Sequence, residues 1–74
     1  MNYQIYNNLV AKTIRRVRKE KNWTQATLAK KLKVDQATIS NYESAKTECT
    51  VSALVQLKAI FGKDFDCIEF PLKD

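Results

Sequence analysis

The stretch 24–46 constrains the fold of this chain more than any other part of the sequence. Its apolar residues recur at spacings of three or four, which place side chains on one face of an α-helix. Leu28 and Leu32 form one such pair, and Ile39 and Tyr42 form a second. The stretch therefore predicts two short helices, joined by a tight turn, that each bury one apolar face.

Four further residues support the same arrangement. The side chain of Ala29 lies beside the two leucines and is small enough for a second helix to cross closely. Val34 falls in the turn and can fill the corner between the helices. Thr24 and Asp35 precede the first and the second helix, and the side-chain oxygen of each can accept a hydrogen bond from a backbone N–H two or three residues on. We therefore expect both residues to cap helices.

This pattern resembles the helix-turn-helix of the phage repressor and Cro-type transcription regulators. The matching residues are Gln25, Leu28, Ala29, Leu32, Val34, Ile39, Tyr42 and Glu43. The likeness extends through helix-like stretches on both sides, from about residue 10 to residue 61. Lys33 and Ala45 depart from the family, which usually has glycine at both places. A lysine in the left-handed turn would carry about 1–3 kcal/mol of strain, unless the turn differs slightly.

The resemblance implies an all-α fold, a compact four- to five-helix repressor-like DNA-binding domain with a central helix-turn-helix. Short extended segments are allowed at the termini, and a single domain covers residues 1–74 with the motif at 24–46. The resemblance also implies an ion pair between Arg18 on the first helix and Glu43 late in the recognition helix. The alternative for this pair is that both side chains are exposed, and the alternative for the motif is a plain helical hairpin.

A further helix is expected before the motif, from a cap at Asn7 or Asn8 to about Lys21. Its buried stripe follows spacings of four and three. The stripe consists of Val10, Ile14 and Val17. After this helix, Asn22 suits a left-handed C-terminal cap, and we expect Trp23 to cover the junction of the first two helices.

The segment after the motif predicts a loop over 47–49 and then a helix over 51–61. Thr50 can cap this helix and Gly62 ends it. The apolar stripe of the helix consists of Leu54, Leu57 and Phe61.

The two termini allow more than one interpretation. Residues 2–6 alternate loosely, as in a strand, and a frayed terminus explains them equally well. In the tail, 63–74, Asp64 can cap a short helix over Phe65 and Ile68. Alternatively, the alternation of Ile68, Phe70 and Leu72 with polar residues indicates an edge strand. We expect a helical turn followed by an extended segment.

Composition limits the classes of function. A chain of 74 residues suffices for one small domain with one core. The net charge of +5 favours an anionic partner, most simply nucleic acid. No apolar run approaches the roughly 20 residues of a membrane span, and no signal peptide is visible. With two cysteines and no histidine, we expect a cytoplasmic protein with reduced thiols and without a zinc site.

Catalysis has little support in the sequence. The chain has no histidine, no glycine-rich phosphate loop and no nucleophile beside a plausible base. We therefore expect no enzyme activity, catalytic residue, cofactor, metal or small-molecule substrate.

The resemblance places the helix over 36–44 in the major groove of double-stranded DNA, with its N-terminal half against the base edges. Its outward positions are Gln36, Ala37, Ser40 and Asn41. Gln36 and Asn41 can make bidentate contacts with adenine, and the methyl group of Ala37 can touch that of thymine.

Other residues are expected to hold the DNA backbone. Thr24 and Gln25 begin the preceding helix, whose N–H groups and dipole suit a phosphate. Thr38 and Ser44 can reach a phosphate or a sugar, and Lys46 follows the recognition helix closely enough to reach another phosphate.

The function expected from this resemblance is that of a sequence-specific transcriptional regulator, most simply a repressor. Motifs of this kind normally use two half-sites, so we expect a homodimer on a pseudo-palindromic operator, joined through the last helix and the tail. The same fold also serves as an antitoxin or as a controller protein of a restriction–modification system. A non-DNA adaptor would instead need an apolar or mixed helix surface, whereas Gln36, Ser40 and Asn41 are polar.

Overall fold

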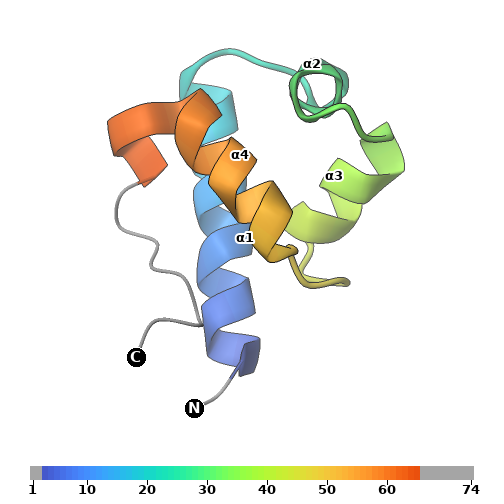
Figure 1. Ribbon diagram of the computed structural model, residues 1–74, viewed down its shortest axis with the longest axis vertical. Helices are drawn as coiled ribbons and strands as arrows, with labels where there is room; N and C mark the ends of the chain where they lie inside the picture. The colour runs from blue at the N-terminus through green and yellow to red at the C-terminus, as the bar shows by residue number, and fades with distance from the viewer. Residues whose placement is uncertain (1–2, 66–74) are drawn as a thin grey trace.

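Apolar residues at helical spacing run through most of the chain, and the computed structural model, which describes residues 3–65, folds them into helices (Figure 1). The elements in order are α1 (Tyr3–Glu20), α2 (Gln25–Leu32), α3 (Gln36–Glu43), α4 (Val51–Phe61) and the 3₁₀-helix η1 (Gly62–Phe65). No strand occurs within residues 3–65. The all-α expectation is therefore confirmed.

The start of α1 differs from the sequence-based expectation. The helix already begins at Tyr3, so the strand-like interpretation is wrong for residues 3–6, and so is the cap at Asn7 or Asn8. Tyr6 explains the difference, because it packs against the core and lies four residues before Val10. The buried stripe of α1 therefore extends one turn further toward the N-terminus, and burial there stabilises the additional turn.

Three helices end with one residue in the left-handed conformation, since Asn22, Lys33 and Ala45 have φ values of 60°, 61° and 60°. At the end of α2, the N–H of Lys33 donates to the carbonyl oxygen of Lys30 at 3.2 Å, and the next N–H donates to that of Ala29 at 3.0 Å. This pairing is a Schellman motif, and the other two ends repeat it. The cap expected at Asn22 is confirmed, and the lysine adopts the left-handed turn that the family usually gives to glycine.

Replacing Lys33 with glycine is expected to raise the free energy of unfolding by about 0.5–1 kcal/mol. The left-handed conformation costs an L-residue about 1–2 kcal/mol, and glycine removes this cost. The greater conformational freedom of glycine in the unfolded chain offsets part of the resulting stabilisation. Urea denaturation of Lys33→Gly measures the change. The matched control is Lys30→Gly, which is exposed inside α2 and should lose about 1 kcal/mol. Equal losses in both variants would contradict strain at residue 33.

The core draws on every element. Its buried apolar residues are Val10, Ile14, Val17, Leu28, Ala29, Leu32, Ile39, Tyr42, Ala53, Leu54, Leu57, Phe61 and Phe65. The apolar stripes expected on the four helices are therefore buried, and Val34 fills the corner after α2 as a partly buried residue. Trp23 covers the junction after α1 and stacks on Phe61, with 5.9 Å between the ring centroids. The helix expected over 51–61 is confirmed as α4, with Gly62 after it.

The expected tail falls partly within the described residues. Asp64 lies inside η1 instead of capping a helix, because the 3₁₀ turn begins directly after α4. Phe65 ends the described chain with its side chain fully buried. The extended segment expected over Ile68, Phe70 and Leu72 lies outside the described residues.

The arrangement leaves one helix at the edge of the molecule. In Figure 1, α2 and α3 lie to one side of α1 and α4, and α3 is the outer element on that side. α3 packs against α2 and α1, so its inner face is fixed and its opposite face stays open.

Candidate nucleic-acid interface

The open face of α3 carries mostly polar side chains. Ile39 is fully buried and Tyr42 is 9% exposed, so these two residues anchor the inner face. The predicted outward positions lie on the other side of the helix. Gln36, Ala37 and Ser40 are exposed, while Thr38 and Asn41 are half-buried. The structure thus brings the candidate base-reading residues together on one surface of a single helix.

The start of α2 uses the threonine hydroxyl for its own cap. The N–H of Thr27 donates to Oγ1 of Thr24 at 3.0 Å, and the two hydroxyl oxygens also lie 3.0 Å apart. The capping role expected of Thr24 is confirmed, but its hydroxyl is largely committed within the helix. The first backbone N–H groups of a helix have no acceptor inside it, so they remain the better phosphate donors at this end.

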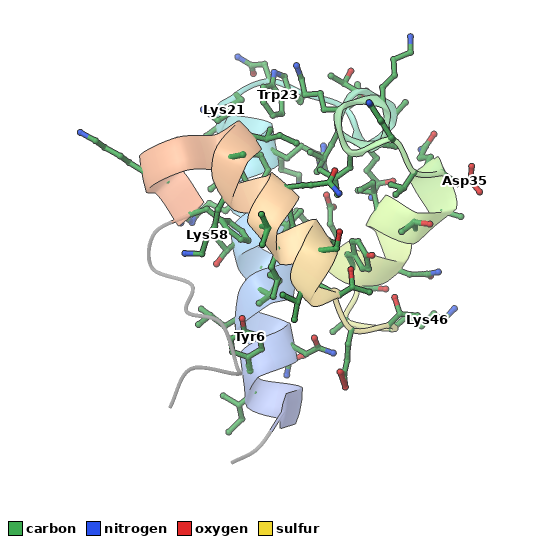
Figure 2. All side chains as sticks on the ribbon, viewed as in Figure 1. Tyr6, Lys21, Trp23, Asp35, Lys46 and Lys58 are labelled. Carbon is green, nitrogen blue, oxygen red and sulfur yellow. The ribbon has the colours of Figure 1, made fainter. Side chains whose placement is uncertain are left out.

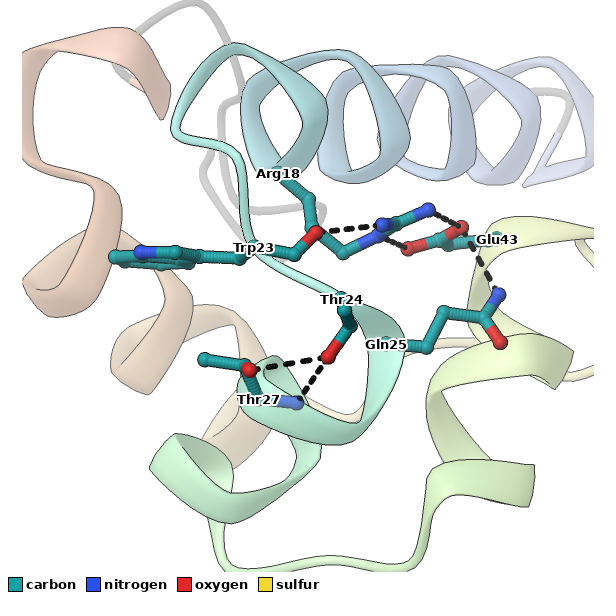
Figure 3. Close-up of polar contacts among 6 residues, drawn as sticks. All are labelled: Arg18, Trp23, Thr24, Gln25, Thr27 and Glu43. Atoms are coloured by element: carbon teal, nitrogen blue, oxygen red, sulfur yellow. Dashed lines mark hydrogen bonds and ion pairs between the residues drawn. The ribbon is translucent and has the colours of Figure 1, made fainter.

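An ion pair connects α1 to α3 (Figure 3). Nε of Arg18 donates to Oε2 of Glu43 at 2.6 Å, and Nη2 donates to Oε1 at 3.1 Å. This two-point contact is the strongest geometry available to an arginine and a carboxylate. The side chains of Arg18 and Glu43 are only 10% and 5% exposed, so water screens the pair little.

Two further hydrogen bonds extend this pair into a network (Figure 3). Nη1 of Arg18 donates to the carbonyl oxygen of Trp23 at 2.8 Å, which secures the chain between α1 and α2. Nε2 of Gln25 donates to Oε1 of Glu43 at 3.2 Å, which links α2 directly to α3. The sequence indicates a phosphate contact for Gln25 but not this hydrogen bond, because no local spacing relates two residues 18 positions apart.

The residues after α3 are held close to its end. The N–H of Lys46 donates to the carbonyl oxygen of Asn41 at 2.9 Å, and the hydroxyl of Ser44 donates to the same oxygen at 3.3 Å. The side chain of Lys46 is exposed. Figure 2 shows Asp35 and Lys46 on the same side of the molecule, where one precedes and the other follows α3.

The cap expected at Asp35 is only half formed. Its backbone has the extended conformation of a helix cap, with φ −74° and ψ 152°, but its carboxylate makes no capping hydrogen bond. Thr38, whose N–H should meet the carboxylate, donates instead to the carbonyl oxygen of Asp35 at 3.0 Å. The prediction of a side-chain cap is therefore wrong, because the backbone already satisfies the donor. Thr50 does cap α4, through the N–H of Ala53 at 3.0 Å.

Other chemistry finds little support in residues 3–65. Burial raises the pKa of the Cys49 thiol to about 12, so the thiol stays protonated at neutral pH and is a poor nucleophile. Within the same residues, no group of three or more histidine, cysteine, aspartate or glutamate side chains could hold a metal ion. None of the helices described is long and apolar enough to cross a membrane.

The sequence pattern of the helix-turn-helix family matches residues 14–66, which contain the motif, the ion pair and α4. The chain belongs to this family. Its members of the phage repressor and Cro type carry DNA-binding domains, so the chain contains a DNA-binding helix-turn-helix domain. Within this helix-turn-helix domain, α2 and α3 are the two helices of the motif, and α3 occupies the position of the second helix.

One curated relative of this helix-turn-helix protein is the antitoxin HipB of Escherichia coli (strain K12). The two chains are 38% identical over 48 residues, which cover 65% of this chain and 54% of the relative. The chain thus spans about half the length of that relative. None of the solved structures matches the chain significantly.

Proposed function

We propose that the chain is a sequence-specific DNA-binding transcriptional regulator, most simply a repressor, that acts without catalysis. The observation that carries this proposal is the open, polar face of α3 opposite two buried anchors, Ile39 and Tyr42. A recognition helix must present varied polar groups to base edges while its backbone stays rigid. The network of Arg18, Glu43 and Gln25 supports that rigidity, because it joins α3 to both preceding helices.

Reading is assigned to the outward side chains of α3. The amides of Gln36 and Asn41 can each donate to and accept from adenine in the major groove, and the methyl group of Ala37 can pack on a thymine methyl. Ser40 is exposed between them and can donate to or accept from either kind of base.

Contacts with the DNA backbone are assigned to groups around this helix. The free N–H groups at the start of α2, beside Thr24 and Gln25, suit one phosphate. Lys46 suits a second phosphate because its backbone is fixed to the end of α3 while its side chain is exposed. Thr38 and Ser44 lie at the margins of the same surface and complete the set.

A homodimer on a pseudo-palindromic operator is the assembly that this function favours. A single α3 reads only a few base pairs, and dimers of such motifs place their recognition helices about 34 Å apart, one turn of DNA. Val51 and Val55 on α4 are 43% and 51% exposed. Their exposure supports a dimer surface that includes α4.

A salt titration with three variants tests which residues contact the bases and which contact the phosphates. Gln36→Ala and Asn41→Ala are each expected to cost about 1–3 kcal/mol on the best site and little on random DNA. Lys46→Ala is expected to weaken both kinds of DNA by similar factors, because a lysine at a phosphate senses charge alone. It should also reduce the slope of log affinity against log salt by about one unit, since one fewer counterion is released.

The matched control for the charge is Lys63→Ala. Lys63 is exposed on η1, an element that Figure 1 places on the other side of α1 and α4 from α3. This variant removes the same charge but should leave the salt slope unchanged. If Gln36→Ala and Asn41→Ala both preserve the ratio of specific to non-specific affinity, α3 is not the reading helix and the proposal fails.

An antitoxin role is the second candidate, and the likeness to the antitoxin HipB favours it. Such a protein would bind a toxin as well as DNA. Expressing the product of the neighbouring gene with and without this chain tests the role. If the neighbouring gene product arrests growth and this chain relieves the arrest, the antitoxin role is supported. If the neighbouring gene product does not affect growth, the antitoxin role loses its support and the role of a transcriptional regulator remains.

A further inference from the structure

Asp35 directly precedes α3, and no role has so far been assigned to its side chain. It occupies the cap position of α3, as Thr24 does for α2 and Thr50 for α4. Both threonines use their side-chain oxygens to accept a backbone N–H at 3.0 Å. The carboxylate of Asp35 does not. The corresponding N–H, that of Thr38, donates at 3.0 Å to the backbone carbonyl oxygen of Asp35.

The carboxylate is therefore free at the leading tip of α3. Asp35 is exposed, and Figure 2 shows its side chain projecting from the molecule beside the first turn of that helix. Within residues 3–65 it has neither a hydrogen bond to its side chain nor an ion pair. No cation of the described chain neutralises it.

A negative charge at this place is unfavourable beside DNA unless it meets a hydrogen-bond donor. Like charges repel, and the groove is lined by phosphates. An ionised carboxylate can only accept hydrogen bonds. At the edges of the major groove, guanine presents two acceptors, and thymine presents an acceptor and a methyl group. Adenine presents an amino group beside an acceptor, whereas the N4 amino group of cytosine has no acceptor beside it on that base.

We propose that Asp35 is a specificity-determining residue that selects cytosine in the operator and rejects guanine and thymine at the same position. The inference rests on the proposed function, since it needs the N-terminal end of α3 in the major groove. The inference goes beyond the proposed function because it names the base that the N-terminal end of α3 recognises. The carboxylate accepts a hydrogen bond from cytosine N4 in the complex and repels the acceptors of the other bases.

Selection of binding sites from random duplex DNA, followed by affinity measurements on the four duplexes that differ at the affected base pair, tests the assignment. Wild type is expected to prefer cytosine there by about tenfold. Asp35→Asn keeps the size and the capping ability of the residue but can bind adenine through its amide. This variant should therefore exchange cytosine for adenine at that one position and leave the other positions unchanged. Asp35→Ser, also a good cap, should lose the cytosine preference without gaining adenine.

Asp64→Asn is the matched control. Asp64 is exposed on η1 and pairs with Lys21 at 3.3 Å, so its substitution changes the net charge equally without touching α3. It should leave the selected sequence unchanged. Thermal melting monitored by circular dichroism verifies that every variant is folded.

The outcomes separate this inference from the function on which it rests. If Asp35→Asn selects the same sequence as wild type while Gln36→Ala changes it, the assignment of Asp35 is overturned and the reading helix stands. If neither those variants nor Asn41→Ala changes the selected sequence, both fail. If Asp35→Asn increases the affinity by the same factor for all four duplexes, the carboxylate repels DNA without discriminating between bases. That result would also overturn the inference. A wild-type site without a cytosine preference would do the same.

Discussion

Replacing Glu43 with alanine is expected to lower the free energy of unfolding by about 3–5 kcal/mol. The carboxylate is 5% exposed and receives both arms of the Arg18 guanidinium. Its removal leaves the cation, whose side chain is 10% exposed, with the carbonyl oxygen of Trp23 as its remaining partner among residues 3–65. A buried charge without its counter-charge costs much more than the net gain from the intact pair. Arg18→Ala should have an effect of similar size.

A double-mutant cycle in urea tests the coupling. Exchanging both residues for apolar ones, as in Arg18→Met with Glu43→Leu, should cost less than the sum of the single changes, because no charge is left alone. Strictly additive effects would contradict the pair. Arg16 and Glu20 supply the control, since their ion pair on α1 is 54% exposed on each side. Glu20→Ala should change the stability by no more than about 0.5 kcal/mol.

Replacing Phe65 with alanine is expected to cost about 3–5 kcal/mol. The side chain is fully buried, and its ring lies 5.5 Å from that of Phe61 in a tilted arrangement. Phe61 in turn stacks on Trp23, so the cavity would open beside the aromatic cluster that closes this end of the core. Denaturation in urea measures the loss.

The control for this prediction is Ile5→Ala. Ile5 is 67% exposed on α1, so the substitution removes an aliphatic side chain without opening a cavity. Its effect should stay within about 0.5 kcal/mol. Equal effects of the two substitutions would show that η1 does not belong to the core.

The ion pair also bears on function, because it joins α3 to the rest of the domain in addition to the buried anchors Ile39 and Tyr42. Arg18 fixes Glu43 from α1, and Gln25 fixes it from α2. A recognition helix misplaced by a small rotation would present other atoms to the bases. Glu43→Ala should therefore reduce specific DNA affinity even at temperatures where the variant is fully folded. Gel-shift measurements well below the melting temperature would detect that loss.

Local sequence patterns were enough to predict the two helices of the motif, the helix over 51–61 and the buried face of α3. The spacing of Leu28 with Leu32, and of Ile39 with Tyr42, follows from the period of one helix and needs no knowledge of its neighbours. That spacing predicted the buried face of α3 and hence the outward positions of the candidate site. The caps at Thr24 and Thr50 and the left-handed turn at Asn22 are equally local and were predicted.

Features that depend on contacts between segments far apart in the sequence could not be predicted from local spacing. The first turn of α1 forms because Tyr6 packs on a core built by other helices. Phe65 is buried because η1 folds back beside α4 and α1. Gln25 contacts Glu43 across 18 residues of chain, and only the packing of α2 on α3 brings the two together. The carboxylate of Asp35 makes no capping hydrogen bond, and the N–H of Thr38 donates to the carbonyl oxygen of Asp35 instead. Sequence spacing does not predict whether that N–H bonds to the side chain or to the backbone of the cap residue.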